Sequence, residues 1–95
     1  MNLAKARFVA LVREFAQNSP IGTLSIRYFT KPDERLDMTL ASNRVYGNRE
    51  EGITIMAAAG LDSVESILNE QLLVLPTLEQ LLALKKKAGI NRPVG

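Results

Sequence analysis

The stretch RLDMTLASNRVYG, residues 35–47, is the part of the chain that best predicts how the rest is arranged. Leu36 and Leu40 are spaced to lie on one face of a helix, and Tyr46 follows about a turn and a half later. Gly47 can adopt a positive φ angle and so end the helix. We therefore expect a short amphipathic helix over residues 35–47, around which the core is organised.

The segments on either side of this helix predict a small sheet and a second helix. Asn48 is suited to cap that helix, with Glu51 three positions inside it, and Gly60 is suited to end it. Residues 23–29 alternate in polarity before the helices, and the apolar residues 72–75 are followed by a proline. The expected order is therefore strand, helix, helix, strand, with the two strands paired.

The alternation in residues 23–29 also predicts which face of the first strand packs inward. Leu24, Ile26 and Tyr28 fall on one face, which we expect to be buried. Arg27 and Phe29 fall on the opposite face.

An amphipathic helix is expected at the start of the chain, over residues 3–17. Its apolar stripe contains Ala4, Phe8, Leu11, Val12 and Phe15. Residues 18–22, NSPIG, contain turn residues and a proline, so we expect a hinge between this helix and the rest. The stripe needs cover, which either its own domain or another subunit could provide.

A final helix is expected over residues 78–88. Thr77 and Gln80 form a capping box at its start, and Gly89 predicts its end. The expected apolar side consists of Leu78, Leu81, Leu82 and Leu84. The basic run Lys85, Lys86 and Lys87 is expected to be solvated at the helix end, where cations are favoured. Residues 91–95 are expected to fray.

Composition excludes several kinds of chemistry. The 95 residues include no cysteine and no histidine, so disulfides, the usual zinc sites and histidine-dependent triads are not available. A net charge of +2 is too small to predict nucleic-acid binding. Arg7, Arg13 and Glu14 interrupt the apolar residues near the start, so neither a signal peptide nor a membrane span is expected. We expect no enzyme activity, no cofactor and no metal, and we expect Asp33 and Glu34 to act as helix-start residues rather than as catalytic groups.

Five pieces of the sequence together resemble the lysin-motif (LysM) family over about half of the chain. They are residues 28–36 (YFTKPDERL), Leu40-Ala41, Val45-Tyr46-Gly47, residues 57–61 (AAAGL) and residues 72–76 (LLVLP). The resemblance implies an α+β fold, with a βααβ core and a two-stranded antiparallel sheet, flanked here by an N-terminal and a C-terminal helix. The chain would then divide into residues 1–19 (helix and hinge), 22–76 (LysM-like domain) and 77–95 (helix and tail).

The best-known role of the family is to bind the N-acetylglucosamine backbone of peptidoglycan or chitin in a shallow groove. Carried over by position, that groove would be lined by Lys31, Pro32, Asp33 and Glu34 on one side and by Gly60, Leu61, Asp62 and Ser63 on the other. The sequence departs from the family at three places. Asp33-Glu34 replaces the usual Gly-Asp turn, Ala59 replaces the usual asparagine, and Glu70-Gln71 replaces the usual Gly-Gln. These changes weaken the expectation of a sugar site.

Residues 40–48 (LASNRVYGN) and 73–77 (LVLPT) look closer to the LysM-like structural proteins of phage tails and baseplates. This resemblance implies a virion protein that contacts other tail or baseplate proteins, or copies of itself in a ring. Docking would involve the helix face formed by Phe8, Leu11, Val12 and Phe15, with no nucleic acid or membrane as partner. The alternative is a module that binds peptidoglycan.

Overall fold

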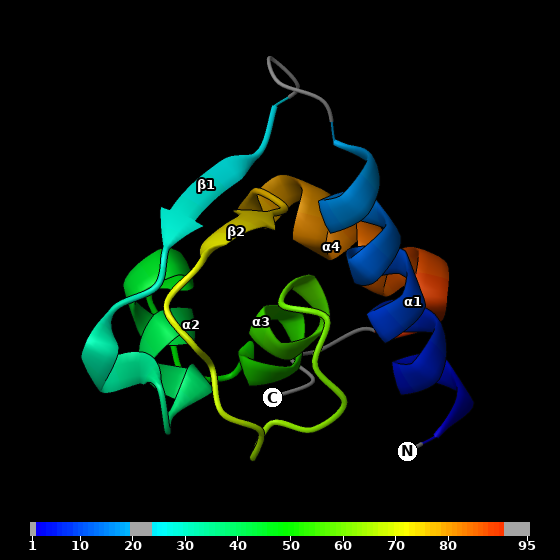
Figure 1. Cartoon of the computed structure of the whole chain (residues 1–95). Helices are drawn as coiled ribbons and strands as arrows, with labels where there is room; N and C mark the ends of the chain where they lie inside the picture. The colour runs from blue at the N-terminus through cyan, green and yellow to red at the C-terminus, as the bar shows by residue number, and fades with distance from the viewer. Residues whose placement is uncertain (1, 20–23, 91–95) are drawn as a thin grey trace.

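The computed structural model describes residues 2–19 and 24–90, which form an α+β structure (Figure 1). Its elements are α1 (Leu3–Asn18), β1 (Ile26–Phe29), the 3-10 helix η1 (Pro32–Glu34), α2 (Met38–Tyr46), α3 (Gly52–Ala58), β2 (Leu72–Leu75) and α4 (Leu78–Ala88). The expected α+β class, with a two-stranded antiparallel sheet and helices on both sides of it in the chain, is confirmed. None of the helices in the described residues is long and apolar enough to cross a membrane.

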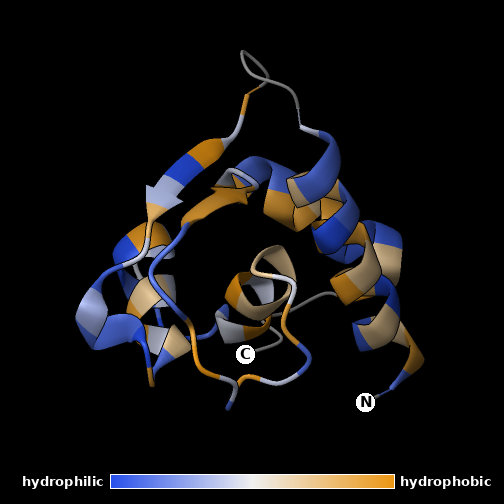
Figure 2. Ribbon diagram, viewed as in Figure 1, coloured by the Kyte–Doolittle hydropathy of each residue, from blue (hydrophilic) through white to orange (hydrophobic). Residues whose placement is uncertain are grey.

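The sheet pairs β1 with β2 in a register that gives it an inner and an outer face. Ile26 lies opposite Leu75, and Phe29 lies opposite Leu72. Leu73 and Leu75 are buried, Ile26 and Tyr28 are partly buried, and Phe29 is exposed. The predicted alternation is thus confirmed for residues 26–29. Figure 2 shows β2 hydrophobic along its whole length and β1 alternating.

The first strand is shorter than expected. Leu24 was predicted to face inward, but it precedes the strand and is 69% exposed. The position opposite it in the register falls at Thr77, whose amide N–H donates to the Gln80 side chain at the start of α4 and not to the first strand. Pro76 has no N–H to donate. The sheet therefore ends at the Ile26–Leu75 pair, and residue 23 lies outside the described residues.

The central element of the core is α3. All its residues from Gly52 to Ala57 are buried, and the helix contacts α1, α2 and β2 (Figure 1). The expectation that residues 35–47 are the organising helix is therefore wrong, because that helix covers only one side of α3.

The N-terminal boundary of α2 also differs from the prediction. Asp37 caps the helix by accepting a hydrogen bond from the Thr39 amide, so the helix starts at Met38 and residues 35 and 36 form a turn. Its buried residues are Met38, Ala41 and Ser42. Leu36, predicted on the buried face, is 81% exposed, and Leu40 is only half-buried. The predicted end is confirmed, since Gly47 has a φ of 79°.

Helix α1 belongs to the same core as the central elements. It packs on α3, α4 and β2, and Phe8 and Val12 are fully buried. Both side chains are therefore covered within the chain, and the prediction that they contact a partner is wrong. Residues 20–22 of the predicted hinge and the predicted tail, residues 91–95, lie outside the described residues.

Helix α4 starts with the predicted capping box between Thr77 and Gln80 and ends at Gly89, whose φ is 88°. Its buried side differs from the prediction. Leu81, Lys85 and Ala88 are buried, whereas Leu78 and Leu82 are more than half exposed. The buried stripe follows the spacing i, i+4, i+7, which places a lysine on the face that contacts the core.

Candidate functional site

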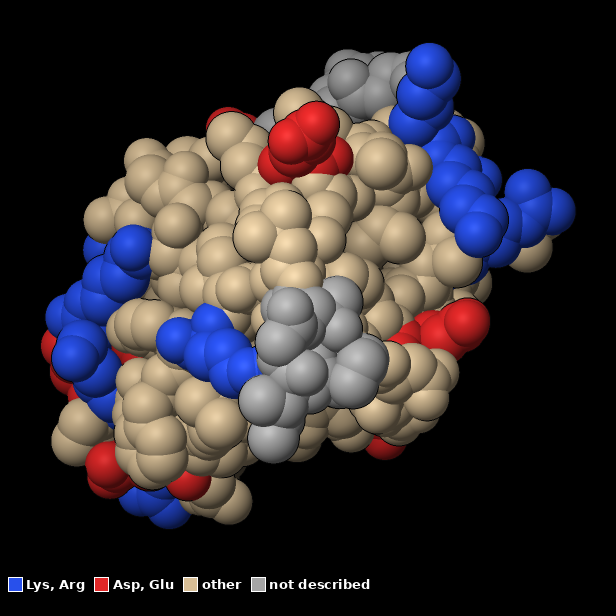
Figure 3. Space-filling model, turned by 90° about the horizontal axis from the view of Figure 1, so that it is seen from above, with Lys and Arg blue, Asp and Glu red and all other residues tan. Residues whose placement is uncertain are grey.

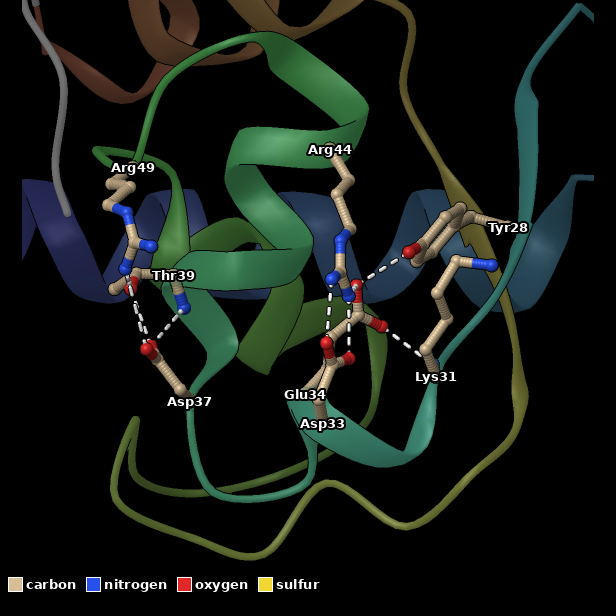
Figure 4. Close-up of polar contacts among 8 residues, drawn as sticks. All are labelled: Tyr28, Lys31, Asp33, Glu34, Asp37, Thr39, Arg44 and Arg49. Atoms are coloured by element: carbon tan, nitrogen blue, oxygen red, sulfur yellow. Dashed lines mark hydrogen bonds and ion pairs between the residues drawn. The ribbon is translucent and has the colours of Figure 1, made fainter.

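The first half of the predicted sugar groove is occupied by an internal hydrogen-bond network (Figure 4). Glu34 is fully buried, and its carboxylate accepts hydrogen bonds from the Lys31 amide at 2.6 Å, the Tyr28 hydroxyl at 2.5 Å and Arg44 at 3.0 Å. Three donors leave this carboxylate little capacity for a ligand. Glu34 thus holds η1 against β1 and α2.

Asp33 is exposed but is also bound within the chain. Both of its oxygens accept from the Arg44 guanidinium, at 2.6 and 2.7 Å. These hydrogen bonds hold the pKa of the Asp33 carboxyl below its ordinary value. The two adjacent carboxylates therefore share one arginine and order the loop.

The second half of the predicted groove lies elsewhere. The Arg13 side chain on α1 donates a hydrogen bond to the Leu61 carbonyl at 2.7 Å. This hydrogen bond holds residues 60–63 on the side of α3 that faces α1. Figure 1 shows this segment and η1 on opposite sides of α3. Residues 68–71 lie beside the first loop instead, because the Leu68 amide donates to the Arg35 carbonyl and the Thr30 amide donates to the Gln71 carbonyl.

The predicted groove is therefore not assembled as one site. Lys31, Pro32, Asp33 and Glu34 are brought together, and so are Gly60, Leu61, Asp62 and Ser63, but the structure does not place the two sets side by side. Asp62 and Ser63 are exposed, and Leu61 is half-buried.

The Tyr28–Glu34 contact predicts unusual titration of the phenol. Burial and the neighbouring carboxylate raise the Tyr28 pKa to about 12, and burial also raises the pKa of Tyr46, the second tyrosine. We expect little phenolate absorbance from the folded protein at pH 10. Because the folded pKa of Tyr28 exceeds its unfolded value of 10.0, its stabilisation is complete below pH 10 and is lost as the pH rises toward 12.

Ultraviolet titration together with denaturant unfolding at each pH measures both effects. The Tyr28→Phe variant should lose less stability between pH 10 and 12 than the wild type. Ionisation of Tyr28 near pH 10 while circular dichroism still reports the folded state would contradict the proposed contact.

A buried ion pair was missed by the sequence prediction. Lys85 was expected to be solvated, yet it is 4% exposed and its ammonium lies 2.5 Å from the Glu51 carboxylate. Glu51 was expected inside a helix capped by Asn48. In the structure Glu51 is itself the N-cap residue of α3, and the Asn48 side chain accepts a hydrogen bond from the Glu50 amide. The signal for Lys85 was present, since it follows Leu81 by four positions and precedes Ala88 by three.

The outer sheet face carries an exposed apolar pair. Phe29 is 61% exposed and Leu72 is 55% exposed, and the register places them directly opposite each other. Cross-strand neighbours lie within contact distance on a shared face. Figure 3 views the molecule from above and shows a broad area of uncharged side chains, with most Lys and Arg at its left and right sides and single basic and acidic side chains within it.

A second apolar surface is a groove between α1 and α4, here called the α1–α4 groove. One depression of about 310 Å³ is lined by Leu11, Phe15 and Leu84, with Glu14 and Lys87 among its polar residues. A neighbouring depression of about 300 Å³ shares Leu11, Glu14 and Lys87 and extends to Arg7 and Ala10. Leu11 and Phe15, two of the four predicted docking residues, therefore line a surface that a partner can reach.

Searches with the chain found no matching family model, no matching curated protein and no matching solved structure. Within the described residues, no group of three or more acidic side chains is placed to hold a metal ion.

Proposed function

We propose that this chain is a non-enzymatic structural component of a phage tail or baseplate, in which a LysM-like core acts as a rigid adaptor between other proteins. The observation that carries the proposal is the exposed Phe29–Leu72 pair on the outer sheet face. Aromatic and aliphatic side chains that are exposed together are typical of surfaces that become buried against another protein.

The polar groups of the chain support an adaptor more than a sugar site. Asp33 and Glu34 are bound by Arg44, Tyr28 and the Lys31 amide, so the carboxylates of the first loop order the domain. The second loop is fastened to α1 by Arg13. A glycan groove needs free hydrogen-bonding groups on both walls.

The phage setting of the proposal is supported by the sequence resemblance in residues 40–48 and 73–77. In that setting the protein would be part of the virion and its partners would be neighbouring tail or baseplate proteins. Strand addition to the sheet offers a further mode of contact, because the sheet formed by the described residues contains only two strands.

The test is complementation of a phage from which the gene has been deleted. We expect the wild-type chain to restore intact tails and to co-purify with them. The double variant Phe29→Asp, Leu72→Asp should stay folded by circular dichroism but fail to join the tails, because it would bury charge in an apolar contact. The matched control is Leu36→Asp, since Leu36 is 81% exposed at a different place.

Normal tails without the gene, or normal incorporation of the double variant, would overturn the proposal. Pull-down on purified peptidoglycan tests the alternative function, and we expect retention well below that of an authentic wall-binding LysM domain. Strong retention that Asp62→Ala abolishes would instead establish a wall-binding module.

A further inference from the structure

We propose that two copies of this chain associate through the α1–α4 groove, with their α1 helices packed antiparallel about a two-fold axis. The inference is independent of the proposed function, because it concerns a different surface from the outer sheet face. It rests on the positions and charges of Arg7, Ala10, Leu11 and Glu14.

These four residues form one stripe along α1. Their spacing, i, i+3, i+4, i+7, keeps them on one face over two turns of helix. Arg7, Ala10 and Glu14 are exposed, and Leu11 is half-buried beside α4. All four line the same depression, together with Lys87 of α4. The stripe is thus an accessible surface with an apolar centre and a charge at each end.

The two charged ends have opposite signs and lie too far apart to satisfy each other. Arg7 and Glu14 are separated by seven residues, or about 10 Å along a helix. Among the ion pairs and hydrogen bonds of the described residues, none involves the side chain of Arg7 or Glu14. Neither charge is therefore held in an ion pair among the described residues.

A second copy complements this stripe when its helix runs in the opposite direction. With the two-fold axis between positions 10 and 11, Arg7 of one copy faces Glu14 of the other, and the same pair recurs at the opposite end. Ala10 then meets Leu11 of the other copy at the centre. An interface of this kind is isologous, so each favourable contact occurs twice.

The side chains at the centre suit a close helix contact. Alanine adds little bulk, so the two backbones can approach, and Leu11 can fill the depression beside Ala10 of the other copy. Lys87 lines both depressions together with Glu14 and supplies a second cation in the groove. A parallel arrangement would instead place Arg7 against Arg7 and Glu14 against Glu14, which is unfavourable.

Sedimentation equilibrium over a range of concentrations tests the proposal. The wild type should approach twice the 10.5 kDa mass of the chain, with an association that weakens as salt is added. Arg7→Glu and Glu14→Arg should each weaken the association at least tenfold, and the double variant carrying both changes should restore it. Lys86→Glu and Glu65→Arg, which change exposed charges outside the groove, are the matched controls.

A disulfide trap gives a second readout that does not depend on affinity. Because the chain contains no cysteine, a single introduced cysteine can form a disulfide only between copies. Ala10→Cys should give a covalent dimer under mild oxidation, whereas Ala6→Cys, exposed on the same helix but outside the groove, should not.

Three results would overturn the proposal: a wild type that stays monomeric at millimolar concentration, a double charge variant that fails to restore association, or equal trapping at positions 6 and 10. Circular dichroism of every variant confirms that α1 is still folded, which is expected because all the altered positions are exposed.

Discussion

Replacing Lys85 with methionine (Lys85→Met) is expected to lower the free energy of unfolding by about 3–5 kcal/mol. The change removes the cation but keeps most of the side-chain volume, so Glu51 is left buried with no opposite charge. The remaining hydrogen bond from Thr54, at 3.3 Å, is too weak to replace an ammonium group. Urea unfolding at neutral pH measures the loss.

Two further variants separate the ion pair from packing. Lys86→Met, at the exposed neighbouring position, should change stability by no more than about 0.5 kcal/mol. The double variant Glu51→Leu, Lys85→Met should recover most of the stability lost in the single variant, because removing both charges also removes their desolvation cost. If Lys85→Met is as stable as the wild type, Lys85 does not pair with Glu51 in the folded protein.

Replacing Phe8 with alanine (Phe8→Ala) should be similarly damaging, with an expected loss of about 3–5 kcal/mol. Phe8 is fully buried on the side of α1 that packs against the core, so truncation leaves a large cavity. A domain of this size has only about 5–15 kcal/mol of stability in total, and the variant should melt at a much lower temperature.

The matched control for Phe8→Ala is Leu3→Ala on the same helix. Leu3 is 66% exposed, so its truncation should have little effect. An unchanged melting temperature for Phe8→Ala would mean that α1 is not part of the domain core and would reinstate the original expectation that Phe8 contacts a partner.

The features that the sequence predicted well are those controlled by local chemistry. Thr77 and Gln80 were identified as the start of α4 because a capping box needs only residues close in the chain. Gly47 and Gly89 ended their helices as expected, since a positive φ favours glycine. The inner and outer positions of Tyr28 and Phe29 followed from strand alternation.

The incorrect predictions concern residues whose burial or position depends on contacts with segments far away in the sequence. The periodicity of α1 shows that one side is apolar, but it does not tell whether α3 and α4 or another protein covers that side. Lys85 is buried only because Glu51, 34 positions earlier, lies across from it. The two walls of the predicted groove were separated by Arg13 and Arg44, whose partners are 48 and 11 positions away.

The burial of α3 between α1, α2 and β2 has a consequence for folding as the chain is synthesised. Residues 52–57 leave the ribosome before β2 and α4 do, so a helix that is buried in the folded protein is exposed in the nascent chain. The Glu51 carboxylate stays hydrated until α4 supplies Lys85. We therefore expect the native structure to form only after α4 has been made, and intermediates that lack α4 to depend on chaperones or to aggregate.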